Sequence, residues 1–233
     1  MIDIGSTNFL IKVPSLSEKD FELYSSDLFD QWEVSVEKNI SLPDYAISLE
    51  IEEGSISGRA KIAAAASVVY LGVATYGSFI TGLQTIRSQI SYVNNVLFES
   101  AKYPFDCSKD NITVRNSGGA ISKLQSLFQK VQKGTLTPDE ATLMAMEIFG
   151  EETEDIPDLA ERLKKEMENA PRYPEQLNLI EEESRECEEA TESITQKPPK
   201  KRTPKPMPIS EQYRIEIWRE SKKDKKHVKF TRK

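Results

Sequence analysis

The sequence has few of the side chains that catalytic and metal-binding sites need. It contains two cysteines, Cys107 and Cys187, and a single histidine, His227, among 233 residues. The cysteines stand far apart in the chain, so their spacing matches neither a disulfide framework nor a zinc site. The histidine is surrounded by lysines, where a buried acid–base pair is not expected, and no nucleotide-binding fingerprint is present. We therefore expect no enzymatic activity, no catalytic or metal-binding residue and no cofactor.

The N-terminus also lacks the features of an export sequence. Its opening residues, MIDIGSTNFLIKVPS, have no basic segment followed by a long apolar one, so we expect no signal peptide. Two isolated cysteines fit a reducing compartment, and we expect a cytoplasmic protein. An inner-membrane location stays open because of one uncharged stretch, described below.

The charge is distributed unevenly along the chain. The apolar content of 38% is below the roughly 45–50% of globular proteins, so part of the chain should lie outside a core. Residues 151–196 contain sixteen acidic and five basic residues, whereas residues 197–233 contain four acidic and fourteen basic ones. We predict a disordered linker over 171–210, acidic at first and then rich in proline and lysine.

The N-terminal residues 1–58 have the pattern of a small α+β unit. Residues 8–14 predict a short strand, and Ser17 is a candidate N-cap for a helix that follows, over 17–31. Apolar residues alternate in the segment WEVSVEK at 32–38 and again at 45–51, which predicts two half-buried strands. The expected order is strand, helix, strand, strand.

Residues 59–170 instead show helical periodicity. Apolar residues spaced by four and three positions from Phe79 to Leu97 predict a buried seam of the coiled-coil type. No proline interrupts the stretch before it, so we predict one long helix from about Arg59 to Lys102. Three shorter helices are predicted at 120–132, 137–150 and 156–170. The residues expected to pack in this helical bundle are Ala74, Ser78, Gly82, Leu83, Ile86, Ile90 and Val93.

The stretch from 62 to 86 has no charged residue and admits two interpretations. It is longer than the ~20 residues that cross a bilayer, and Ala74, Ser78 and Gly82 repeat at a spacing that lets membrane helices pack closely. Its glycines, serines and threonines, however, make it only weakly apolar. A core helix of a soluble bundle is the interpretation that we favour.

Residues 211–233 predict a basic β-hairpin, because apolar residues alternate on both sides of a lysine-rich turn. Together with the preceding proline- and lysine-rich segment, the hairpin offers positive charge and aromatic rings to a polyanion, either nucleic acid or anionic lipid. A solvated tail that attracts the chain's own acidic run is the alternative. The residues expected to bind a polyanion are Lys200, Lys201, Arg202, Trp218, Lys222, Lys223, Lys225 and Lys226.

The segment QLNLI at 176–180 resembles the pentapeptide by which bacterial proteins dock on the replicative sliding clamp. In that family the glutamine and the apolar side chains fill a pocket of the clamp, a role that the resemblance assigns to Gln176, Leu177, Leu179 and Ile180. Ile180 stands where the family usually has an aromatic residue. The alternative is that these apolar residues pack on the helical bundle.

The layout as a whole, a small α+β unit joined to an apolar helix, resembles small accessory and effector proteins of bacterial anti-phage systems. We therefore expect a mixed α+β, non-enzymatic interaction protein that binds a protein partner or itself through its helices. Two other functions stay open. One is a membrane-inserting effector that uses residues 62–86, and the other is a nucleic-acid or sliding-clamp binder that uses the C-terminal tail.

Overall fold

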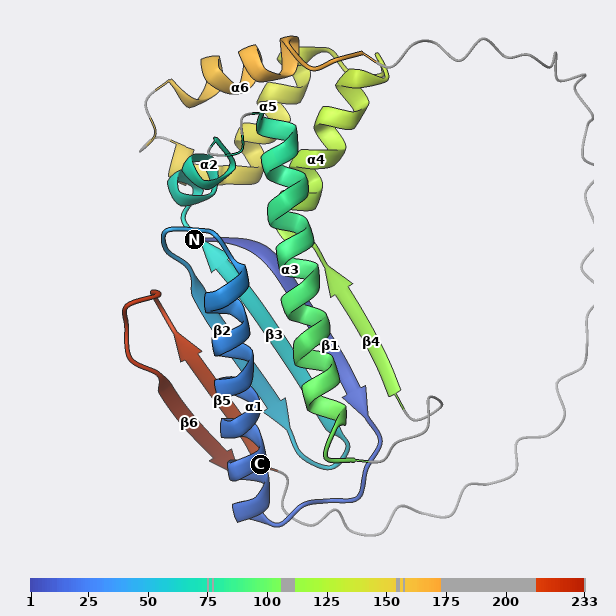
Figure 1. Cartoon of the computed structure of the whole chain (residues 1–233), viewed down its shortest axis with the longest axis vertical. Helices are drawn as coiled ribbons and strands as arrows, with labels where there is room; N and C mark the ends of the chain where they lie inside the picture. Colours follow the sequence, from blue (N-terminus) through green and yellow to red (C-terminus); the bar gives the residue numbers. More distant parts are fainter. Residues whose placement is uncertain are drawn as a thin grey trace, which may run out of the picture. The chain divides into compact units, whose positions relative to one another are not determined.

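A six-stranded antiparallel sheet forms the centre of the fold, with the strand order β4-β1-β3-β2-β5-β6 (Figure 1). The computed structural model describes residues 1–74, 76, 78–105, 112–153, 156, 158–172 and 213–232, and the structural statements below concern these residues. The strands are β1 (Ile2–Ile11), β2 (Ala46–Glu52), β3 (Ile56–Ala64), β4 (Ile112–Ser117), β5 (Tyr213–Arg219) and β6 (His227–Arg232).

The helices lie in two groups. Helices α1 (Glu18–Asn39) and α3 (Phe79–Lys102) lie side by side across one face of the sheet (Figure 1). The others gather near one end of α3. They are α2 (Ala66–Ala74), α4 (Gly119–Gln132), α5 (Pro138–Phe149), the short 3₁₀ helix η2 (Gly150–Thr153) and α6 (Leu159–Glu168). The predicted mixed α+β class is confirmed.

The core lies between the sheet and the pair α1 and α3. Alternate residues of the strands point into it, and Ile47, Leu49 and Ile51 of β2 are each at most 1% exposed. Ile215 and Ile217 of β5 are buried in the same way. Because successive side chains of a strand point to opposite faces, the residues between them form an outer face, which we define below.

Helix α1 continues through the segment that was predicted as a strand at 32–38. Its start is as predicted, since Ser17 is the N-cap and accepts a hydrogen bond from the backbone N–H of Asp20. Trp32 and Val36 are fully buried and stand one helical turn apart, whereas Val34 is 64% exposed. The strand predicted at 32–38 is therefore wrong. Val34 lies outside the core, and the buried residues follow the helical period.

The order strand, helix, strand, strand occurs in the structure, but its elements are not all the ones predicted. The strand predicted at 8–14 corresponds to β1, which begins earlier, at Ile2. The strand predicted at 45–51 is β2, which pairs with β3 along its length. The third strand of this order is therefore β3 and not the 32–38 segment.

The single helix predicted from Arg59 to Lys102 is wrong. Residues 59–64 belong to β3, α2 follows, and Ser78 starts a new helix by capping α3. In β3 the burial alternates, with Ala60 and Ile62 inside and the charged residues between them outside. A period of two indicates a strand. The strand was overlooked because no proline separates it from the helical residues that follow.

The burial predicted for the second half of that stretch is confirmed within α3, which packs on β1 as well as on the helices α1, α2 and α4. The residues at four- and three-residue spacing are all buried: Phe79, Leu83, Ile86, Ile90, Val93 and Leu97. The small residues Ala74, Ser78 and Gly82 do not share one helix, because Ala74 ends α2 and Ser78 caps α3. A Cβ on Gly82 would lie 2.2 Å from the carbonyl oxygen of Val73, so this glycine allows α2 and α3 to pack closely within the chain.

No helix within the described part of the chain has both the length and the apolar character needed to cross a membrane.

The boundary predicted between residues 58 and 59 also has to be corrected. It falls inside β3, and β4 adds a further strand from the part predicted to be all helical. Strand β4 lies at an edge, and all but its first residue are exposed. A strand with both faces exposed does not need alternating apolar and polar residues. The period that identifies a half-buried strand is therefore missing from β4.

The shorter helices of this region agree with the sequence. Helix α5 begins with a capping box in which Thr137 and Glu140 bond each other's backbone N–H, and Gly150 ends it. Apolar residues at helical spacing are buried in the other two helices: Ile121, Leu124, Phe128 and Val131 in α4, and Leu159, Leu163 and Met167 in α6.

The predicted C-terminal hairpin is present and belongs to the sheet. Strand β5 pairs with β2 on one side and with β6 on the other. The side chain of Arg219, 5% exposed, points to the helix side of the sheet, where its Nη1 lies 2.7 Å from carboxylate oxygens of both Glu33 and Glu37 of α1. The hairpin therefore completes the sheet and is joined to α1 by a buried charge.

The packing of α3 on β1 gives a first prediction. Ile90 is 2% exposed, and its Cγ2 would lie only 2.3 Å from a Cβ on Gly5 of β1. The substitution Ile90→Asp would bury an unpaired carboxylate in this contact, so we expect the free energy of unfolding to fall by about 3 kcal/mol or more in a urea titration. The exposed neighbour Ser91 supplies the control, since Ser91→Asp should change it by less than about 0.5 kcal/mol. Equal stability of the two variants would contradict the described packing.

The buried arginine gives a second prediction. Replacing Arg219 with alanine leaves two glutamates without their counter-charge at the sheet–helix contact. We expect a loss of about 2–4 kcal/mol in unfolding free energy, somewhat less than for a fully buried pair, because the side chain of Glu37 is 43% exposed. Arg232→Ala removes an ion pair to Glu18 whose side chains are 58% and 39% exposed, and should cost less than about 1 kcal/mol. If both substitutions cost the same, Arg219 does not hold the hairpin.

Candidate functional site

The face of the sheet opposite α1 and α3, which we call the outer face, carries a row of polar side chains. Strand register places them next to one another: Asn8 stands opposite Arg59, Arg59 opposite Glu50, and Glu50 opposite Glu216. One step along, Lys61 stands opposite Ser48. Burial alternates along the same strands, with Arg59 and Lys61 exposed between buried neighbours. The outer face is thus open to a ligand.

A hollow of about 310 Å³ lies in the middle of the outer face. Strands β2, β3 and β5 contribute its walls. The lining side chains on the outer face are Ser48, Glu50, Arg59, Lys61, Glu216 and Trp218.

The two carboxylates that line the hollow are paired with cations outside it, both with Arg214 and Glu216 also with Lys229. Nη2 of Arg214 lies 2.9 Å from Glu50 and 2.7 Å from Glu216. Arg59 donates from Nε to the side-chain oxygen of Asn8 at 3.3 Å. Neither Arg59 nor Lys61 has an ion-pair partner among the described residues. Two cations in the hollow therefore remain available for an anionic ligand.

Trp218 adds an aromatic surface beside these cations. It stands directly opposite His227 in the β5–β6 pair, and the two rings stack with centroids 5.5 Å apart and an interplanar angle of 21°. Trp218 is half-buried and His227 is exposed. The pair presents flat π surface next to positive charge, an arrangement that can stack a nucleic-acid base.

The turn between β5 and β6 is held against the helix side of the sheet by Asp44. Burial of this carboxyl opposes its ionisation, but hydrogen bonds from the backbone N–H of Lys222, the Ser221 hydroxyl and the backbone N–H of Tyr45 outweigh that effect, so the pKa of Asp44 is lowered. Burial raises the pKa of the neighbouring Tyr45 to about 12, so its hydroxyl stays neutral. These contacts fix the turn and with it the strand that carries Trp218.

The structure separates the residues that were predicted to bind a polyanion. Trp218 lies on the outer face, whereas Lys226 is ion-paired with Asp30 of α1 and Lys222 lies 5.7 Å from the centre of the Tyr45 ring. Lys223 and Lys225 are exposed in the turn. Lys200, Lys201 and Arg202 lie outside the described residues.

Sequence reasoning missed Arg59 and Lys61 as members of this site. Both were assigned to the start of a long helix, on the basis of the uncharged stretch that follows them. The pattern that identifies them is the alternation of charged and apolar residues in SGRAKIA, which begins at Ser57.

The remaining predicted positions do not join the outer face. The clamp-like residues Gln176, Leu177, Leu179 and Ile180 lie outside the described residues, as does Cys107. The helix-packing residues Leu83, Ile86, Ile90 and Val93 are buried in the core on the other side of the sheet. Within the part of the chain that the structure describes, no cluster of three or more His, Cys, Asp or Glu side chains could hold a metal ion.

Comparison of the chain with models of known protein families, with curated proteins and with solved structures gives no match.

Proposed function

We propose that the protein is a non-enzymatic binding protein and that its outer sheet face holds a polyanion, specifically a single strand of nucleic acid. The observation that carries this proposal is the hollow in which Arg59 and Lys61, both without an ion-pair partner among the described residues, lie together with Trp218. An accessory role in a bacterial defence system and docking on a sliding clamp are separate hypotheses that rest on sequence resemblance alone.

The geometry of a strand supports an extended ligand. Arg59 and Lys61 are two residues apart in β3, so they project from the same face about 6.7 Å apart along the strand. Phosphates of a single strand can pair with both cations in turn, and each pairing releases condensed counterions. A base next to those phosphates can then reach the ring of Trp218.

Further cations extend the same row to both edges of the sheet. Arg115 of β4 stands opposite Asn8, which itself stands opposite Arg59. Lys229 of β6 stands opposite Glu216 at the other side. The row therefore runs across the strands. Its five cations are Arg59, Lys61, Arg115, Arg214 and Lys229, and its three carboxylates are Glu50, Glu52 and Glu216. All three carboxylates pair with Arg214, and Glu216 also lies 3.8 Å from Lys229.

The first test is electrostatic. We expect the full chain to bind a fluorescein-labelled single-stranded oligonucleotide, with affinity that falls steeply as salt rises. The double substitution Arg59→Gln/Lys61→Gln should weaken binding at low salt by about ten-fold or more. It should also reduce the slope of log K against log salt by roughly 1.4, because two phosphate contacts are lost.

The control changes the same charge elsewhere. Lys133, at the end of α4, and Lys165, on α6, are both exposed. The double substitution Lys133→Gln/Lys165→Gln should therefore leave the slope of log K against log salt nearly unchanged. Anionic lipid vesicles form the comparison ligand. The proposal fails if the full chain does not bind the oligonucleotide at low salt, if the two double variants have the same slope, or if vesicles bind and the oligonucleotide does not.

The second test concerns stacking. The chain has two tryptophans; Trp32 is fully buried, so quenching of tryptophan fluorescence by a bound base should come from Trp218. We expect saturable quenching with the oligonucleotide, and a loss of about 1–3 kcal/mol in binding free energy for Trp218→Ala. Trp218→Phe keeps an aromatic ring and should retain most of that energy. Quenching that persists in Trp218→Ala, or equal binding by all three proteins, would show that no base stacks there.

A further inference from the structure

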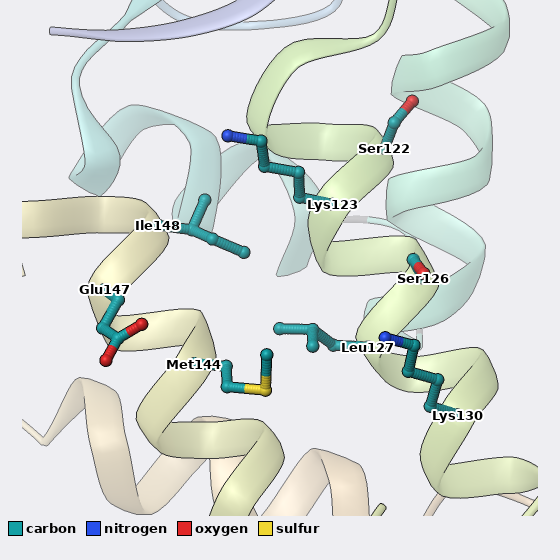
Figure 2. Close-up of a pocket in the computed structure, with 8 residues that line it drawn as sticks. All are labelled: Ser122, Lys123, Ser126, Leu127, Lys130, Met144, Glu147 and Ile148. Carbon is teal, nitrogen blue, oxygen red and sulfur yellow. The ribbon is translucent and has the colours of Figure 1, made fainter. Parts of the chain in front are cut away.

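A second surface lies between α4 and α5, made by elements that do not form the outer face. A hollow of about 610 Å³ separates the two helices. Figure 2 shows that Leu127 from α4 and Met144 and Ile148 from α5 point into it. Helix α4 supplies Lys123 and Lys130 at its border, and α5 supplies Glu147.

The floor of this groove is apolar and in part open to solvent. Leu127 is 4% exposed and closes the bottom, whereas Met144 is 41% exposed. Ile148 is half-buried beside them. A floor of this kind gains free energy when apolar side chains cover it, and it offers little to phosphate groups.

The charges on the two walls differ in sign. Lys123 and Lys130 are seven residues apart in α4, so they lie on the same side of that helix, about 10 Å apart along its axis. Glu147 stands on the opposite wall. None of the three forms an ion pair with another described residue. A ligand that carries negative charge along one flank and positive charge along the other would satisfy all three.

The groove follows most of the length of α4. A second hollow, of about 420 Å³, shares Ser122, Lys123 and Ile148 with the first and continues it past the start of α4 to Ile2 and Asp3. Helix α4 itself has 14 residues, about 21 Å at 1.5 Å per residue. A hydrophobic groove between helices is one of the recurring sites at which an amphipathic helix docks.

We propose that the groove between α4 and α5 docks an amphipathic α-helix of a partner protein, with its apolar stripe on Leu127, Met144 and Ile148. The flank of the partner helix that faces α4 carries carboxylates, which pair with Lys123 and Lys130. Its other flank carries a basic residue opposite Glu147. The orientation of the helix about its own axis is fixed by this difference in charge.

The experiment uses the full chain and a labelled model peptide of about 14 residues, the length of α4. The peptide has leucine at helical spacing, glutamate along one flank and a lysine along the other, and its binding is followed by fluorescence anisotropy. We expect saturable binding, and Lys123→Glu/Lys130→Glu should weaken it by about ten-fold or more. Met144→Asp should weaken it as well, because it places a charge under the apolar stripe.

Matched controls separate the groove from general charge attraction. Lys19 and Lys165 are exposed on α1 and α6, so Lys19→Glu/Lys165→Glu makes the same charge change and should leave binding unaltered. A peptide with lysine in place of glutamate should bind the Lys123→Glu/Lys130→Glu variant better than it binds the original protein. The proposal is overturned if the peptide does not bind, if a scrambled peptide of the same composition binds equally, or if both double variants weaken binding alike.

Discussion

The buried contact of Arg219 with Glu33 and Glu37 is the interaction on which the arrangement of the sheet depends. It joins the strand β5, near the end of the chain, to α1, near its beginning. A buried ion pair adds little net stability compared with well-packed apolar residues in the same place. Removing one partner alone is costly, however, because the other charge is then buried without a counter-charge. The contact therefore disfavours positions of β5 in which Arg219 would lie away from the two glutamates. The position of β5 puts Trp218, the residue before Arg219, on the opposite side of the sheet, beside Arg59 and Lys61.

The outer face and the α4–α5 groove differ in the kind of ligand that their physical chemistry favours. The outer face is polar, and in its hollow Arg59 and Lys61 have no ion-pair partner among the described residues, whereas Glu50 and Glu216 are paired with Arg214. The groove is apolar at its base and has charges of both signs at its border. The residues that line the hollow of the outer face and those that line the hollow between α4 and α5 are all different, so the two proposed ligands do not compete for the same side chains.

The sequence was sufficient where one period dominates and insufficient where two compete. Leu83, Ile86, Ile90 and Val93 repeat at helical spacing, and all of them are buried in α3. At 32–38 the apolar residues fit both periods, and the segment is helical because Trp32 and Val36 complete the buried side of α1. At Arg59 and Lys61 a helix was predicted, and the segment is a strand. The site itself depends on pairing between strands far apart in the chain, such as β2 and β5. The alternation of apolar residues decides which face of a strand points to the core, but it does not say which strands become neighbours. Trp218 could therefore be selected for its chemistry, but its neighbours could not.

The insertion of β5 beside β2 has a consequence for how the chain is made. Leu49 pairs with Ile217, so a growing chain completes β2 long before its partner exists. At about 5–20 residues per second the delay is roughly 10–30 s, during which β2 has one edge without a partner, and such edges recruit strands from other chains. The position of β2 inside the sheet thus exposes the nascent chain to aggregation until β5 has been made. Rapid binding of a chaperone to the free edge of β2 would favour a high yield of folded protein.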